Sequence, residues 1–180
     1  MTLVLVAKLY PNTAVSRRDK ISFERKYSRH LLKTVVSALF DCILYDDEVG
    51  EIVRTRRFES PIGPTYVSLA HKYPFIVVAF DTSPIGVDYE CGRKFGEIPH
   101  NSFFSYRQRR WIAAAPSDNE RNFRILLEWT RGEAVYKCST KDGLVVRSVV
   151  YLGDDADNIL SVATTGPTRL YIVNILLGVE

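Results

Sequence analysis

Apolar residues recur along this chain with two different periods. Between Ile21 and Phe40 they return every three or four positions while basic residues fill the other face, which predicts a long amphipathic helix. From Thr65 the pattern changes to short apolar runs interrupted by Tyr73-Pro74 and Ser83-Pro84, a pattern typical of strands joined by tight turns. We place these strands at residues 65–69, 75–80 and 85–89, after an apolar run at residues 1–7 that we interpret as a buried strand.

The second half of the chain follows a similar order. Residues 103–115 have helical propensity, and Ser117 with Glu120 forms a capping-box signature that opens a second helix toward Lys137. Strands are predicted at residues 144–152, 159–163 and 169–177. The pattern therefore predicts an α+β fold in one compact unit with two pseudo-equivalent halves, residues 1–84 and 85–180. Each half would be a small antiparallel sheet packed with a long helix, with a shared interface where ligands often bind.

Composition favours a globular protein outside the membrane. The chain has 180 residues, of which 46% are hydrophobic, enough for the core of one domain or of two small packed halves. Its longest apolar stretches are shorter than the roughly 20 residues that a membrane span needs. The apolar N-terminus lacks the features of a signal peptide. Cys42, Cys91 and Cys138 have neither disulfide nor zinc-site spacing, so we expect reduced thiols in a cytoplasmic protein.

Positive charge is concentrated near the N-terminus. The net charge is only +3, but residues 1–33 contain eight Lys or Arg and two acids. This distribution favours an anionic partner for the N-terminal part, although a solvated helix face would have the same composition. A nucleic-acid-binding module that uses residues 17–33 is a further alternative. We do not expect nucleic acid, because Phe23 and Tyr27 fall on the apolar stripe and no nucleic-acid-binding signature is present.

Three groups of residues can carry chemistry. Asp88 and Glu90 lie two apart near a strand end, so their side chains share one face, with Cα atoms about 7 Å apart, and can hold a divalent cation such as Mg²⁺. Glu133 and Lys137 are spaced by four residues on one helix face. His71 lies at the end of a predicted strand. Each group alone also fits an ordinary structural or surface role.

Taken together, these residues resemble the motifs of the 4′-phosphopantetheinyl transferase superfamily, in its longer pseudo-dimeric type. The matching segments are Ser68-Leu69-Ala70-His71, Gly86-Val87-Asp88-Tyr89-Glu90, Phe103-Phe104-Ser105, the run from Trp129 to Lys137, and Arg29-His30-Leu31-Leu32. Enzymes of this family transfer phosphopantetheine from coenzyme A to a serine of an apo acyl, peptidyl or aminoadipate-pathway carrier protein and release 3′,5′-ADP. The resemblance thus implies a Mg²⁺-dependent transferase with the coenzyme A site between the halves.

The resemblance also implies a role for each matching residue. Asp88, Glu90 and Glu133 would hold Mg²⁺ against the pyrophosphate of coenzyme A. Glu133 would act as the general base toward the carrier serine, and Lys137 would neutralise the departing phosphate. Arg29 and His71 would bind coenzyme A phosphates. The exposed segment Phe103 to Trp111, with Arg107, Arg109 and Arg110, would meet an acidic carrier.

Several positions depart from the family pattern. Gly132 replaces the lysine that usually precedes the motif glutamate, and Gln108 replaces an acid found in some relatives. Ala70 and Lys72 replace the serines that usually flank the histidine, and no G-K-P element precedes the first strand block. None of these changes removes a metal ligand. They leave open the alternative of a catalytically weakened relative that binds coenzyme A or another nucleotide.

Overall fold

The computed structural model describes residues 1–11, 16–97, 103–138, 140, 143–152, 157–166 and 169–179. The elements in chain order are β1 (Thr2–Pro11), α1 (Arg17–Phe40), α2 (Asp46–Thr55), β2 (Arg57–Ser60), β3 (Gly63–Lys72), β4 (Phe75–Asp81), β5 (Ile85–Cys91), α3 (Tyr106–Ala113), α4 (Asp118–Cys138), β6 (Leu144–Leu152), β7 (Asp157–Thr165) and β8 (Leu170–Val179). The predicted α+β class is confirmed. None of the described helices is long and apolar enough to cross a membrane.

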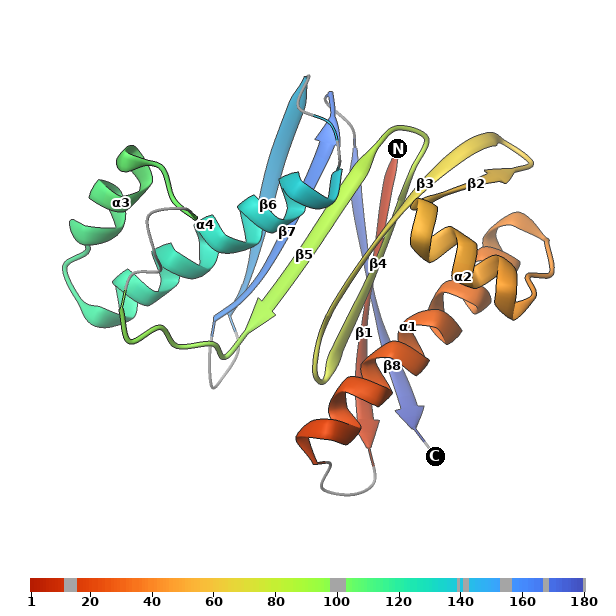
Figure 1. Ribbon diagram of the computed structural model, residues 1–180, viewed down its shortest axis with the longest axis horizontal. Helices are drawn as coiled ribbons and strands as arrows, with labels where there is room; N and C mark the ends of the chain where they lie inside the picture. The colour runs from red at the N-terminus through yellow and green to blue at the C-terminus, as the bar shows by residue number, and fades with distance from the viewer. Residues whose placement is uncertain are drawn as a thin grey trace.

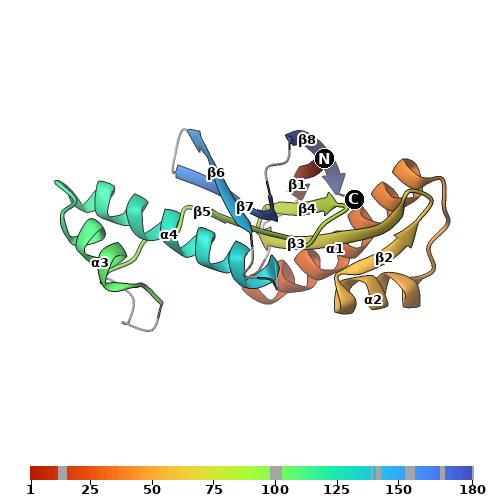
Figure 2. The ribbon, with the colours of Figure 1, turned by 90° about the horizontal axis from the view of Figure 1, so that it is seen from above.

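The strands form two sheets of unequal size (Figures 1 and 2). The larger sheet has the order β2-β3-β4-β1-β8, and the smaller sheet has the order β5-β7-β6. The smaller sheet is antiparallel, as predicted. The larger sheet differs from the prediction because β8, from the far end of the sequence, pairs in parallel with β1. The equivalence of the two halves and a boundary after residue 84 stay predictions.

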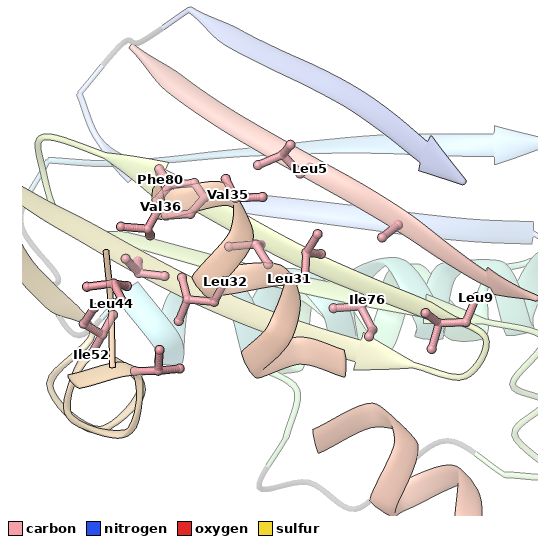
Figure 3. Packing of buried hydrophobic residues seen from close by; sticks show 14 residues of the cluster. Leu5, Leu9, Leu31, Leu32, Val35, Val36, Leu44, Ile52, Ile76 and Phe80 are labelled. Carbon is pink, nitrogen blue, oxygen red and sulfur yellow. The ribbon is translucent and has the colours of Figure 1, made fainter. Parts of the chain in front are cut away.

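Helices α1 and α2 cover one face of the larger sheet. Ser16 begins α1 by accepting a hydrogen bond from the Asp19 amide at 3.2 Å, and the helix ends where Asp41 adopts a left-handed conformation. Figure 3 shows α1 residues packed over strand residues, with α2 contributing Ile52 at the side. The labelled residues of α1 are Leu31, Leu32, Val35 and Val36, and those of the strands are Leu5, Leu9, Ile76 and Phe80.

The other face of the larger sheet packs on the smaller sheet. Val4 and Val77 from the larger sheet meet Val87 and Leu160 from the smaller one, and all four side chains are fully buried. The central strands β1 and β4 are thus covered on both faces, which explains their nearly continuous apolar sequences. The Ser68 hydroxyl accepts a hydrogen bond of 3.0 Å from the Val87 amide and so fastens β5 to β3.

Helix α4 packs on the outer face of the smaller sheet through Ala134 and Cys138, which contact Ala163 of β7. Its start agrees with the predicted capping signature, since the Ser117 hydroxyl accepts a hydrogen bond of 3.2 Å from the Glu120 amide. The short helix α3 precedes it at one end of the elongated molecule (Figure 2). All three cysteines are free thiols, as predicted.

Candidate active site

Strand β5 carries the two predicted acids where α4 and the end of β3 meet. Residues at odd positions of the strand, such as Val87 and Tyr89, enter the apolar cluster between the sheets. Asp88 and Glu90 alternate with them and therefore share the opposite face. Both acids are 8% exposed. Buried carboxylates need nearby cations or hydrogen-bond donors, so their partners define the site.

Helix α4 lies against β5 (Figure 1), and Gly86 lets the helix backbone approach the strand unusually closely. A Cβ atom at this position would lie 1.9 Å from the Ala134 carbonyl oxygen and 2.5 Å from the Cys138 amide nitrogen. Only glycine allows this approach, because both obstructing atoms belong to the helix backbone. The close packing brings the last turns of α4 over Asp88. The Lys137 ammonium lies 2.7 Å from Asp88 Oδ1 and donates to the Val87 carbonyl at 3.2 Å.

Asp88 lies within electrostatic reach of two further acids. Burial raises the pKa of the Asp88 carboxyl above its ordinary value, and the Lys137 ammonium opposes that increase. The negative charges of Glu90 and Glu133 raise the pKa further. The fold thus places Lys137 in direct contact with Asp88 and brings Glu90 and Glu133 within electrostatic range of it.

Glu90 contacts two basic side chains. Lys72 Nζ lies 2.8 Å from its Oε2 atom, and Arg93 Nη1 donates to its Oε1 atom at 3.0 Å. The Oε2 atom is buried, and its contact with Lys72 is an ion pair without regular hydrogen-bond geometry. The Arg93 guanidinium lies 4.6 Å from the ring centre of Phe95 and 4.7 Å from that of Trp129. The motif tryptophan thus holds a cation beside the site.

The predicted phosphate-binding residues His71 and Arg29 do not lie together. His71 Nδ1 is 3.2 Å from Oε2 of Glu24 on α1, and Glu24 also accepts the Tyr73 amide at 2.7 Å. Arg29 follows Glu24 by five residues, so the two side chains point in directions about 140° apart around α1. It lines a different groove, between α1 and α2, together with Lys33 and other residues.

A groove beside Lys137 separates α2 from the end of α4. It has a volume of about 680 Å³ and is lined by Arg54, Arg56, Gly132, Tyr136 and other residues. The Arg56 guanidinium donates to the Lys137 carbonyl at 2.6 Å, so a cation from the N-terminal part of the chain fastens the end of α4. The groove therefore presents arginine charge beside the last turns of α4.

The donor chemistry of the acid cluster suits Mg²⁺, which prefers carboxylate and water oxygens. Asp88, Glu90 and Glu133 supply such oxygens, and the Glu90 Oε2 atom is buried without a regular hydrogen bond. Among the described residues, no three His, Cys, Asp or Glu side chains are arranged as a metal-binding group. A physical reason is that Asp88 and Glu90 are oriented toward lysine and arginine.

A scan against protein-family models finds no match for this chain. A search of curated proteins finds no similar sequence either.

The positions that depart from the family pattern have structural surroundings of their own. Gln108 completes a capping box at the start of α3, because its Oε1 atom accepts the Ser105 amide at 2.8 Å. It also donates to Glu128 on α4, where a second acid would be repelled. Gly132 is exposed, with open space around its missing Cβ. Arg131 is directed toward Ser148 and Glu128, so its charge does not replace the missing lysine.

Sequence reasoning missed the partners of the acids. The motifs point to Lys72 only as a departure from the family pattern, and they do not single out Arg93 or Glu24. Lys72 meets Glu90 because β3 lies beside β5, a tertiary neighbourhood that no local pattern reveals. The contact of Arg93 with Glu90 could have been predicted from the sequence, because Arg93 follows Glu90 by three residues just past the end of the strand.

Proposed function

We propose that this protein transfers 4′-phosphopantetheine from coenzyme A to a serine hydroxyl of an apo carrier protein in a Mg²⁺-dependent reaction that releases 3′,5′-ADP. The observation that carries the proposal is the buried pair Asp88 and Glu90, packed under the Glu133 to Lys137 turn of α4. Burying carboxylates near one another is costly, and a fold has no need of such a cluster for stability alone.

Asp88, Glu90 and Glu133 would hold the magnesium ion, which neutralises charge on the pyrophosphate of coenzyme A when it is bound. In the transfer, the serine oxygen forms a bond to the phosphorus of the phosphopantetheine group. The bond from that phosphorus to the oxygen shared with 3′,5′-ADP breaks. Such a reaction depends on charge neutralisation and alignment of the two groups more than on covalent participation of the protein.

The chain's own residues would supply the proton transfer and the remaining charge. Glu133 is half-buried on α4 and would accept the serine proton as general base. Lys137 is fixed by the Val87 carbonyl and would neutralise negative charge on the departing phosphate. Arg54 and Arg56 line the neighbouring groove, which has room for part of a nucleotide. The contacts of His71 and Arg29 with coenzyme A stay predictions.

The carrier protein would approach from the side of α3. Arg107 and Arg110 are exposed there beside the apolar side chains of Phe103, Tyr106 and Trp111. Carrier helices are usually acidic, so this mixture of positive charge and exposed apolar surface suits them. The class of carrier, whether acyl, peptidyl or aminoadipate-pathway, stays open.

The decisive experiment is intact-mass spectrometry of apo carrier proteins incubated with this protein, coenzyme A and Mg²⁺. We expect one phosphopantetheine mass to be gained, and the gain to disappear with EDTA. Glu133→Gln should abolish transfer while leaving the thermal unfolding curve unchanged. Glu120→Gln, in the first turn of the same helix and paired with Arg124, is the matched control and should transfer normally. Activity that survives in Glu133→Gln would show that the assigned base is wrong.

A weakened relative that binds coenzyme A without transfer is the second candidate. It is favoured by the open surroundings of Gly132 and by the direction of Arg131, which leave the usual lysine charge unreplaced. Magnesium-dependent coenzyme A binding with no mass gain on any carrier would select it. A nucleic-acid-binding role is less well supported, because Phe23 and Tyr27 stack on each other and pack on the core.

A further inference from the structure

The two cations on Glu90 differ in how they are held. The Arg93 guanidinium lies beside the rings of Phe95 and Trp129. Its backbone carbonyl accepts a hydrogen bond of 2.9 Å from Asn122 of α4, which fixes the loop after β5. Lys72, in contrast, is the last residue of β3 and extends its ammonium toward Glu90 on a flexible four-carbon chain. Lys72 is therefore the cation that can leave Glu90 more readily.

The position of Lys72 conflicts with a bound metal. Its Nζ atom lies 2.8 Å from Glu90 Oε2, a buried oxygen of the proposed ligand set. Magnesium would need to lie about 2.0–2.1 Å from a ligating oxygen. An ammonium and a divalent cation so close together would repel each other strongly in a partly buried site. The same oxygen therefore cannot serve both cations at once.

We propose that Lys72 is an exchangeable counterion. It neutralises Glu90 in the metal-free protein, leaves when the divalent cation binds, and then offers its charge to the anionic ligand beside the metal. This inference rests on the proposed function, since it takes Glu90 to be a metal ligand. It assigns a role to a residue at which the chain departs from the family pattern.

The exchange couples the two ligands. Metal binding must displace Lys72, which lowers metal affinity in the absence of a phosphate-bearing ligand. An anion that pairs with the released ammonium offsets the free energy lost when the ion pair with Glu90 breaks. Anion and metal should therefore each tighten the binding of the other by the same factor. The coupling should depend on a positive charge at position 72, because a neutral side chain neither competes with the metal nor contacts the anion.

The test is a titration with Mn²⁺, followed by electron paramagnetic resonance and calorimetry, with and without 3′,5′-ADP. Without nucleotide, Lys72→Met should bind Mn²⁺ about 1.5- to fivefold more tightly than the wild type, the range expected for loss of one partly exposed ion pair. Lys72→Arg should keep the wild-type affinity. Lys94→Met removes an equal charge from the exposed loop after β5 and should change the affinity little. The nucleotide should tighten Mn²⁺ binding in the wild type and less in Lys72→Met.

The outcomes separate this inference from the proposed function. Mn²⁺ affinity that is unchanged or weaker in Lys72→Met, with normal binding by the wild type, would overturn the exchange and leave the metal site in place. If the folded wild type binds no Mn²⁺ with or without nucleotide, the proposed metal site is wrong and the exchange with it. Arg93 still neutralises Glu90 in the variant, so it should fold. Should it not, Lys72→Gln gives the same comparison.

Discussion

Replacement of Gly86 by alanine tests the packing that creates the candidate site. The added Cβ would lie 1.9 Å from the Ala134 carbonyl oxygen, whereas real Cβ contacts are essentially never under 3.0 Å, so α4 must retreat by at least 1.1 Å. Rotation of a side chain cannot relieve this clash, because the obstructing atoms are backbone. Overpacking in a tight core costs about 1–3 kcal/mol and occasionally more, so we expect a loss of about 3 kcal/mol in the free energy of unfolding.

Urea denaturation followed by circular dichroism measures that loss. Gly132→Ala is the matched control on the same helix, since its new Cβ meets nothing within 4 Å. Alanine there should stabilise the protein by about 0.5–1 kcal/mol, the usual difference between the two residues in a helix interior. If Gly86→Ala unfolds at the wild-type urea concentration with an unchanged slope, the close approach of α4 to β5 is refuted. Destabilisation by Gly132→Ala would contradict the open surroundings of that position.

Two further substitutions test residues in and beside β5. Ser68→Ala deprives the buried Val87 amide of its acceptor, so the free energy of unfolding should fall by about 1–3 kcal/mol in urea denaturation, and a change under about 0.5 kcal/mol would contradict this role. In metal-free protein, burial raises the folded pKa of Asp88 above the unfolded value, so stability should fall as pH rises through the interval between them. Urea midpoints across this interval should show a weaker decline in Asp88→Asn, and an identical decline would contradict the assignment.

The spacing of apolar residues predicted the long helices and most strands. Each long helix buries one continuous apolar stripe, and each of these strands contains a short apolar run. The predicted helix 21–40 corresponds to α1, and the strands near residues 65–89 correspond to β3, β4 and β5. Helix α2 was missed because it is short and buries only Val49 and Ile52. The parallel pairing of β8 with β1 was not predictable locally, since it joins residues from opposite ends of the chain.

The candidate site was predictable where it depends on local geometry. Alternation along β5 places Asp88 and Glu90 on one face, and a spacing of four places Glu133 near Lys137 on α4. Their association across the two elements was suggested only by the family resemblance. The close approach at Gly86 and the ion pair of Lys72 with Glu90 depend on how elements pack, which the local pattern does not encode. Arg29 and His71 were grouped by resemblance, but Arg29 is turned by about 140° around α1 from Glu24, the residue that His71 contacts.

The parallel pairing of β8 with β1 also has a consequence for the order of folding. Residues 2–11 cannot pair on both edges until residues 170–179 have been synthesised and have reached β1. Closing so long a loop makes this pairing slow, and until then β1 presents an open edge of apolar residues to other chains. A fragment that ended before β8 would keep this edge permanently. The last strand thus protects the first from association with other molecules.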